Sequence, residues 1–421
     1  MLKSNIAWMK KNVPSDLKVW KGMIQDIDWS QVAAKTKLSL QRDKDRITAE
    51  FKEFAAMDTS AKIDWLMNGD RHLGYLYKKD AIAFARREWK GLKSVGYDFV
   101  GWLKIWGGML NMVMKDPISI LLAVFEYHWF ASYLATPAVV DRSVFGRRGK
   151  LLQADFDMWV AITHWAEDLI ANLIMADAKI GGNQKINKRI IMFDEMTMAQ
   201  MMAGFPNLIG IPYQMIPVFM VSEMDQLTLI PYIDAIESYG LPSDTCPLPT
   251  AECGCAVKDE YPMCGQGFIA SSMPCDGSVM ATSFQDRRFS KFMPSYPLCM
   301  PVRYDDEDTT EMAAADMKDC IHWVESLTGE TWNWDTYFAT MEKMNECTRL
   351  EMEKWEINKT HYPQLVGSSF ELFRKWNYEM DGGLFPEGLK TQRKICKTMM
   401  ETYEKKLPAY VGGYEKYRAL I

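Results

Sequence analysis

The chain has 421 residues, of which 48% are hydrophobic and 25% are charged, a composition typical of a globular protein with two or three domains. The formal net charge is −6, with acidic and basic residues mixed along the chain. Because no basic block is long enough to neutralise a run of phosphates, nucleic acid is excluded as a partner.

The first 185 residues are predicted to form a mainly helical N-terminal region. Apolar residues recur at three- and four-residue spacing in the segments Ile47–Met57, Ala61–Met67 and Ala81–Lys93. The chain also holds 31 methionines and 15 tryptophans, which suit large helical cores and subunit interfaces.

One stretch of this region, Pro117–Val140, is long enough to cross a membrane. Glu126, His128 and two prolines interrupt it, so we expect a buried helix or a subunit contact and no membrane span. The N-terminus lacks the apolar core of a signal peptide, and we therefore expect a cytoplasmic protein.

Residues 186–308 are predicted to form a parallel α/β domain. Short apolar runs fit for buried strands alternate here with helical segments, which is the pattern of a parallel sheet. The expected strands are Arg189–Phe193, Ile211–Met220, Phe268–Ser271 and Leu298–Val302. The helices between them are expected to open at Thr197–Ala203 and to span Asp225–Tyr239.

Residues 309–421 are predicted to be a helical C-terminal segment. Asp335–Glu356 carries apolar residues spaced for one buried face, and Leu389–Lys406 is expected to be a further helix.

The nine cysteines are unevenly placed, and none precedes Cys246. In a chain without a secretion signal they are expected to be reduced. Cys246 follows an expected helix and turn, and Cys275 follows an expected strand. Loops at the carboxyl ends of parallel strands converge, so these two thiols can share one site.

Thiolates are soft ligands for iron–sulfur clusters or zinc, and buried thiols without a metal are a third interpretation. A zinc ribbon needs two closely spaced cysteine pairs, whereas this chain has the single pair Cys253 and Cys255. The residues alone leave the iron–sulfur, zinc and buried-thiol interpretations open.

The order of several motifs from Arg189 onward resembles the first domain of the 2-hydroxyacyl-CoA dehydratase and benzoyl-CoA reductase family. The similar segments are RIIMF, the Thr197–Gln200 helix start, IPYQMIP, PSDTCP with Cys246, FIASSMPCDG with Cys275, PLCMPV, the TGETWNWDTYFATMEKMNECTR helix and the terminal EKYRALI. The resemblance implies a flavodoxin-like sheet between the two helical regions.

The resemblance also implies that Cys246 and Cys275 are two of three thiolates that hold one [4Fe-4S] cluster. In the family the third comes from a second, similar domain that follows the point where this chain stops. We therefore expect a homologous partner subunit to supply it, with a local replacement as the alternative and loss of the cluster as a third possibility. Among local candidates, Cys264 is included in the predicted metal-binding set, and Cys299 also lies near a predicted strand edge.

The implied activity is that of an iron–sulfur subunit of a radical (R)-2-hydroxyacyl-CoA dehydratase, a lyase that forms 2-enoyl-CoA through a ketyl radical. Its implied partners are the acyl-CoA substrate and an ATP-dependent activator that donates an electron. A benzoyl-CoA-type reductase subunit and a non-catalytic electron-transfer or structural subunit are the alternatives.

Two hydroxyl side chains are the catalytic candidates. Thr197 matches a family position near the substrate, and Ser271 could donate a hydrogen bond to the cluster or substrate. The alternatives are a helix N-cap at Thr197 and an ordinary strand-end serine at Ser271.

Overall fold

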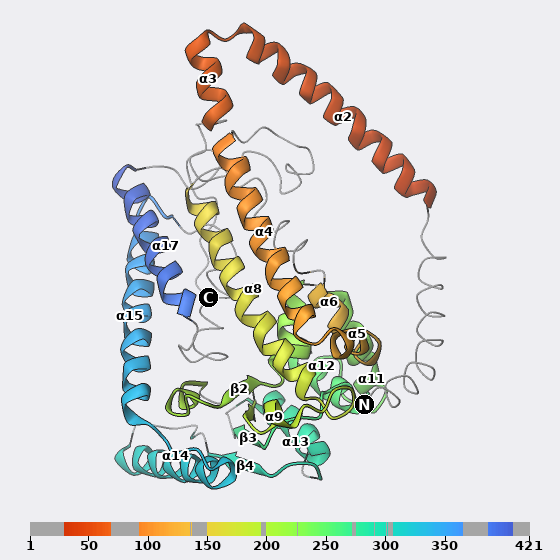
Figure 1. The fold of residues 1–421 in the computed structure, drawn as a ribbon, viewed down its shortest axis with the longest axis vertical. Coiled ribbons are helices and arrows are strands. Elements are labelled where there is room, and N and C mark those ends of the chain that lie inside the picture. Colours follow the sequence, from red (N-terminus) through yellow and green to blue (C-terminus); the bar gives the residue numbers. More distant parts are fainter. Residues whose placement is uncertain are drawn as a thin grey trace.

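A computed structural model describes eleven stretches of the chain. These are residues 29–68, 92–134, 136, 150–194, 199–224, 226–271, 275–289, 291–299, 301, 306–364 and 386–406. A helical N-terminal region, a small sheet surrounded by helices and a helical C-terminal segment follow one another along the chain (Figure 1). This is the mainly helical α/β architecture that the sequence predicts.

The sheet has four strands, and every neighbouring pair is parallel. The strands are β1 (Ile190–Phe193), β2 (Ile209–Pro212), β3 (Gly267–Ser271) and β4 (Ser295–Leu298). Their order is β2-β1-β3-β4, with Ile191 opposite Gly267 and Phe268 opposite Ser295. This is the beginning of the flavodoxin-like order, in which the topological switch point lies between β1 and β3.

Both faces of the central strands β1 and β3 are buried, which explains why these two strands are mostly apolar runs. Ile191 and Phe193 of β1 pack toward α14 (Glu307–Thr328) and the short helix η2 (Ala199–Gly204). Ile190 and Met192 belong to a second core that reaches the N-terminal helices. The strand therefore alternates between two different cores.

Two of the predicted strands have different bounds in the structure. The predicted strand Ile211–Met220 is wrong beyond Pro212, because Met215–Phe219 forms a π-helical turn, η3. The predicted strand Leu298–Val302 shares only Leu298 with β4, and Met300 and Val302 lie outside the described residues. A short run in which nearly every residue is apolar has no measurable period, so it fits a buried helix as well as a buried strand.

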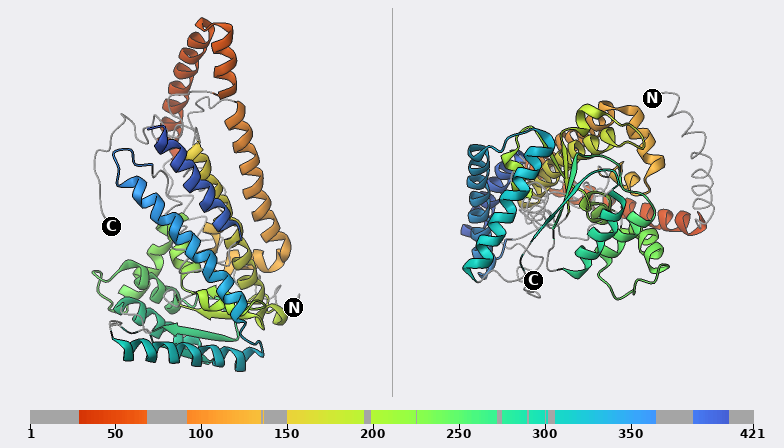
Figure 2. Two further views of the ribbon diagram at one scale, coloured as in Figure 1. Left: turned by 90° about the vertical axis from the view of Figure 1, so that its left-hand side faces the viewer. Right: turned by 90° about the horizontal axis from the view of Figure 1, so that it is seen from below.

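The remaining helices surround the sheet and extend from it (Figures 1 and 2). Those between the strands are α10 (Met220–Met224), η4 (Gln226–Leu229), α11 (Ile230–Glu237), α12 (Pro247–Val257) and α13 (Asp276–Phe289). The C-terminal ones are α14, α15 (Trp334–Asn358) and α17 (Pro386–Glu404). The predicted helices Asp335–Glu356 and Leu389–Lys406 are confirmed as α15 and α17.

The N-terminal region is helical where the structure describes it, and most of the predicted helix Ala81–Lys93 lies outside the described residues. Its helices are α2 (Trp29–Ala56), α3 (Thr59–Asn68), α4 (Leu92–Lys115), α5 (Pro117–Glu126), α6 (Phe130–Leu134), α8 (Lys150–Ala176) and α9 (Gln184–Asn187). Helices α2 and α3 point away from the rest of the described chain (Figure 2). The predicted helices Ile47–Met57 and Ala61–Met67 lie within α2 and α3.

The helical region and the sheet share one hydrophobic core, which runs from α4 and α8 to β1, β3 and α17. Buried Asp177, just after α8, accepts hydrogen bonds from the Tyr127 hydroxyl and from the backbone N–H of Met263, at 2.7 Å for the latter. These contacts fix the first helices against the loop that enters β3.

Among the described residues, no single helix is long and apolar enough to cross a membrane. Val95–Lys115 and Pro117–Glu126 meet that test only when taken together, as a pair bent by 97°.

Candidate functional site

Cys246 and Cys275 each stand directly before a helix. Cys246 is the N-cap of α12, and its carbonyl accepts hydrogen bonds from the Thr250 N–H at 3.2 Å and the Thr250 hydroxyl at 2.8 Å. The carbonyl of Cys275 accepts from the N–H of Val279 at 3.0 Å, in the first turn of α13. Cys246 is exposed and Cys275 is half-buried. Their positions before two helices match the loops predicted to converge.

The first turns of α12 and α13 lie against each other. A Cβ atom on Gly277 would be 2.6 Å from Cγ of Pro249, and 3.9 Å from Sγ of Cys275. Pro249 is the third residue of α12, and Gly277 is the second of α13. The missing side chain at Gly277 therefore lets the two cysteine-bearing turns approach closely, so the structure brings Cys246 and Cys275 to one side of the domain.

A buried polar network lies beside them, at the switch point between β1 and β3. Asp194, which follows β1, is 2% exposed and accepts the Ser271 N–H at 2.6 Å and the Ser271 hydroxyl at 2.9 Å. The Thr282 hydroxyl of α13 donates to the same carboxylate at 3.4 Å. The side-chain amide of Gln214, beyond β2, donates to Thr282 at 3.3 Å. Sequence reasoning missed Asp194, although a polar residue at the end of an apolar strand was a usable signal.

Of the two predicted catalytic residues, only Ser271 lies among the described residues. Ser271 is buried, and its hydroxyl hydrogen bonds to both oxygens of Asp194, at 2.9 Å each. Its single proton is thus directed at a carboxylate rather than at a ligand. Thr197 lies outside the described residues. Both catalytic roles stay predictions.

The third predicted metal ligand, Cys264, lies away from the other two. It precedes β3, close to the amino edge of the sheet, because the N–H of neighbouring Gln266 donates to Ile190, the first residue of β1, at 2.9 Å. Its Sγ is fully buried, 3.6 Å from Sδ of Met192. Burial, with the charge of Asp177, raises the pKa of this thiol well above its usual value. The structure does not bring Cys264 together with Cys246 and Cys275.

Most of the other cysteines are also committed to packing. Those that are buried are Cys253, Cys255, Cys320, Cys347 and Cys396. Burial raises the pKa of Cys253 and of Cys320 to about 12, which disfavours the thiolate that a metal requires. Cys299 is exposed at the carboxyl end of β4, where its N–H donates to Asp316 at 2.6 Å.

The described residues do not contain a complete metal site. They contain no group of three or more His, Cys, Asp or Glu side chains that could hold a metal ion. Cys246 and Cys275 fit a thiolate-held cluster in donor type and in placement, because soft sulfur ligands stand on two adjacent turns. A third ligand is not in place among the residues described.

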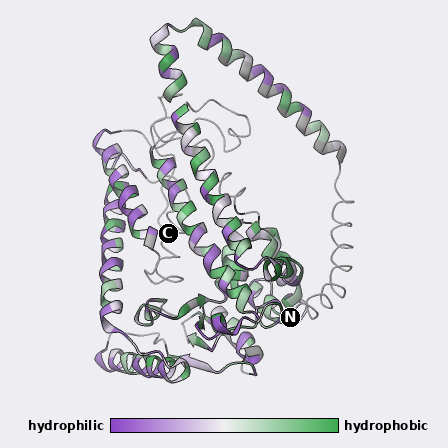
Figure 3. Cartoon of the chain, viewed as in Figure 1, coloured by the Kyte–Doolittle hydropathy of each residue, from purple (hydrophilic) through white to green (hydrophobic). Residues whose placement is uncertain are grey.

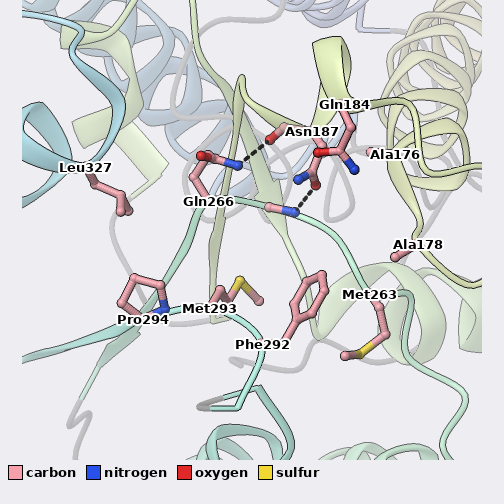
Figure 4. A pocket seen from close by; sticks show the side chains of 11 residues that line it. Ala176, Ala178, Gln184, Asn187, Met263, Gln266, Phe292, Met293, Pro294 and Leu327 are labelled. Carbon is pink, nitrogen blue, oxygen red and sulfur yellow. Dashed lines mark hydrogen bonds between the residues drawn. The ribbon is translucent and has the colours of Figure 1, made fainter.

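A cavity of about 380 Å³ lies at the amino edge of the sheet (Figure 4). Side-chain amides and apolar groups line it, and no lining residue is charged. The Oδ1 atom of Asn187 accepts the N–H of Gly265 at 2.6 Å, and the side-chain amide of Gln266 donates to the Asn187 carbonyl at 3.5 Å. The polar side chains that line the cavity are thus partly occupied by hydrogen bonds between α9 and the segment before β3.

Helix α4 carries apolar side chains on two opposite faces. Its inner face packs on α8, where Gly101 and Gly108 leave room for Phe156, His164 and Glu167. Its outer face holds exposed apolar residues, here called the outer α4 stripe: Val95, Phe99, Trp102, Leu103, Trp106, Leu110 and Met114. Figure 3 shows hydrophobic residues along the length of α4, whereas α14 and α15 are mostly hydrophilic. A helix that is apolar on both faces is normally covered on both.

Part of the chain matches a known protein family. Residues 226–421 match the family model described as 2-hydroxyglutaryl-CoA dehydratase, D-component. The matched stretch contains Cys246 and Cys275, β3, β4 and the C-terminal helices, whereas β1 and β2 precede it. No curated protein matches the chain.

Proposed function

Because residues 226–421 belong to the family of the 2-hydroxyglutaryl-CoA dehydratase D-component, we propose that this chain is the iron–sulfur subunit of an (R)-2-hydroxyacyl-CoA dehydratase complex. The observation that carries this proposal is that Cys246 and Cys275 stand directly before two helices. The first turns of these helices pack against each other through Pro249 and Gly277. Both cysteines lie within the matched stretch, beside the switch point where α/β proteins bind their ligands.

In this proposal Cys246 and Cys275 are thiolate ligands of a [4Fe-4S] cluster. The first turns of α12 and α13 present the positive ends of two helix dipoles, which stabilise thiolates at these positions. These residues would hold the cluster, which would supply one electron, received from an activator and recovered at the end of the cycle, for the loss of the C2 hydroxyl and a C3 proton as water. Asp194 and Ser271 hold the adjoining strand ends in place.

A partner subunit supplies the third ligand in this proposal. The described residues hold no third donor beside Cys246 and Cys275, and burial keeps Cys253, Cys264 and Cys320 in the thiol form. The outer α4 stripe offers the apolar surface that such a subunit would cover, since tryptophan is enriched at the cores of subunit interfaces. An ATP-dependent activator completes the system as electron donor.

The test of this function is purification of the complex under anaerobic conditions, followed by iron analysis, visible absorbance and EPR. We expect brown protein that bleaches in air and that dehydrates a 2-hydroxyacyl-CoA once the activator and ATP are added. Colourless protein with stoichiometric zinc would contradict the assignment.

Substitution in the outer α4 stripe tests the partner contact. Trp102→Glu and Trp106→Glu place a charge on the apolar surface, and we expect the complex to dissociate in native mass measurements. The control is Trp355→Glu on α15, because Trp355 is 47% exposed and lies outside the stripe. An intact complex in both stripe variants would show that the partner binds elsewhere.

A second candidate function follows from the incomplete ligand set. With two placed thiols, the chain could serve as a non-catalytic electron-transfer or structural subunit of the same complex. Turnover separates the two: a complex that binds iron through this chain yet dehydrates substrate equally well with Cys275→Ser would support the non-catalytic role.

A further inference from the structure

The buried carboxylate of Asp194 joins three elements that are distant in sequence. It follows β1, it accepts both the N–H and the hydroxyl of Ser271 at the end of β3, and it accepts the hydroxyl of Thr282 in α13. Gln214, beyond β2, donates to Thr282 and extends the network to a third strand end. A carboxylate that is 2% exposed is costly to bury unless several donors compensate its charge, and these groups provide them.

These hydrogen bonds are made on both sides of Cys275 along the chain, and Cys275 stands directly before the first turn of α13. Ser271 is the last residue of β3, and Thr282 lies two turns into α13, so Asp194 is bonded on both sides of Cys275. The Ser278 hydroxyl, one turn into α13, donates to Sγ of Cys275 at 3.5 Å. The position of this sulfur therefore depends on how α13 is held against the ends of β1 and β3.

We propose that Asp194 is a positioning residue for Cys275: its carboxylate fixes the first two turns of α13 against the end of β3 and thereby the direction of the Cys275 sulfur. That the bound group is an iron–sulfur cluster rests on the proposed function. The hydrogen bonds that hold α13 do not depend on it. It also gives Ser271 a different role from the one predicted, as a donor that anchors Asp194 rather than a residue that contacts substrate.

The chain offers a matched control on the same helix. Asp286 of α13 accepts the hydroxyl of Ser295, the first residue of β4, at 2.7 Å. It is thus a second carboxylate–serine pair between α13 and the sheet, located at the opposite, amino edge. Asp286→Asn should weaken a contact of the same chemistry without disturbing the turn that carries Cys275.

The experiment compares Asp194→Asn, Thr282→Val and Asp286→Asn in the full-length chain. In iron-free protein, alkylation of Cys275 by iodoacetamide is followed by peptide mass spectrometry, with exposed Cys299 as the internal reference. We expect the ratio of Cys275 to Cys299 labelling to rise at least about threefold in Asp194→Asn, because the half-buried thiol gains access when α13 loosens from the ends of β1 and β3. Thr282→Val should change it less, in the same direction, and Asp286→Asn should not change it.

In the anaerobic complex, the EPR spectrum and midpoint potential of the bound iron should shift in Asp194→Asn and stay unchanged in Asp286→Asn. Absence of iron from the wild-type complex would refute the proposed function, whereas the labelling ratio would still decide the role of Asp194. Unchanged labelling and spectra in folded Asp194→Asn would overturn the positioning role. So would loss of folding in both Asp194→Asn and Thr282→Val, since the network would then support the whole domain.

Discussion

The two edges of the sheet hold cysteines in opposite environments. At the carboxyl edge, Cys275 follows β3 and is half-buried, beside the exposed Cys246 that begins α12. At the amino edge, Cys264 precedes β3 and is fully buried against Met192. Cys275 lies eleven positions after Cys264, yet burial leaves Cys264 as a packed thiol, whereas Cys275 is half-buried directly before α13. The residue type alone therefore does not identify a ligand.

The largest effect is expected from replacing a cysteine at the carboxyl edge. Cys246→Ser or Cys275→Ser should abolish iron binding, since a hydroxyl is a poor substitute for a thiolate on iron. Iron analysis and EPR of the anaerobic complex measure this. Cys347→Ser, in the middle of α15, is the control and should keep its iron. Full iron content in Cys275→Ser would remove the basis of the assignment.

A smaller but still large effect is expected at Gly277. The Cβ atom of Gly277→Ala would lie 2.6 Å from the ring of Pro249, so the first turns of α12 and α13 must separate. Overpacking of this kind typically destabilises by about 1–3 kcal/mol. We expect reduced iron occupancy together with this loss in urea unfolding. Gly96→Ala is the control, because a Cβ atom there meets nothing within 4 Å.

The smallest effect is expected at the amino edge. Cys264→Ala removes one buried sulfur and should destabilise the chain by about 1–2 kcal/mol through the small cavity that it leaves. Iron content should stay at the wild-type level, because this thiol points into the core. If Cys264→Ala lost iron as completely as Cys275→Ser, the local ligand considered from the sequence would be established and the contrast between the two edges would fail.

The sequence indicated much of this arrangement but not its details. The alternating apolar runs predicted β1 and β3 closely, because strands buried on both faces must be apolar throughout. They misplaced β2, because Met215–Phe219 forms a π-helical turn, and β4, because this strand begins at Ser295, before the apolar run. The local composition does not distinguish a short buried strand from a short buried helix or loop.

Sequence by itself determined the order of the elements, the helical regions on either side of the sheet, and the placement of Cys246 after a helix and turn and of Cys275 after a strand. Tertiary structure decided which thiols come together, because the distance between α12 and α13 depends on Pro249 meeting a glycine 28 residues later. It also decided that Cys264 is buried and that Asp194 closes a network between β1, β3 and α13. These features depend on contacts between segments distant in the chain, which local periodicity and residue spacing do not encode.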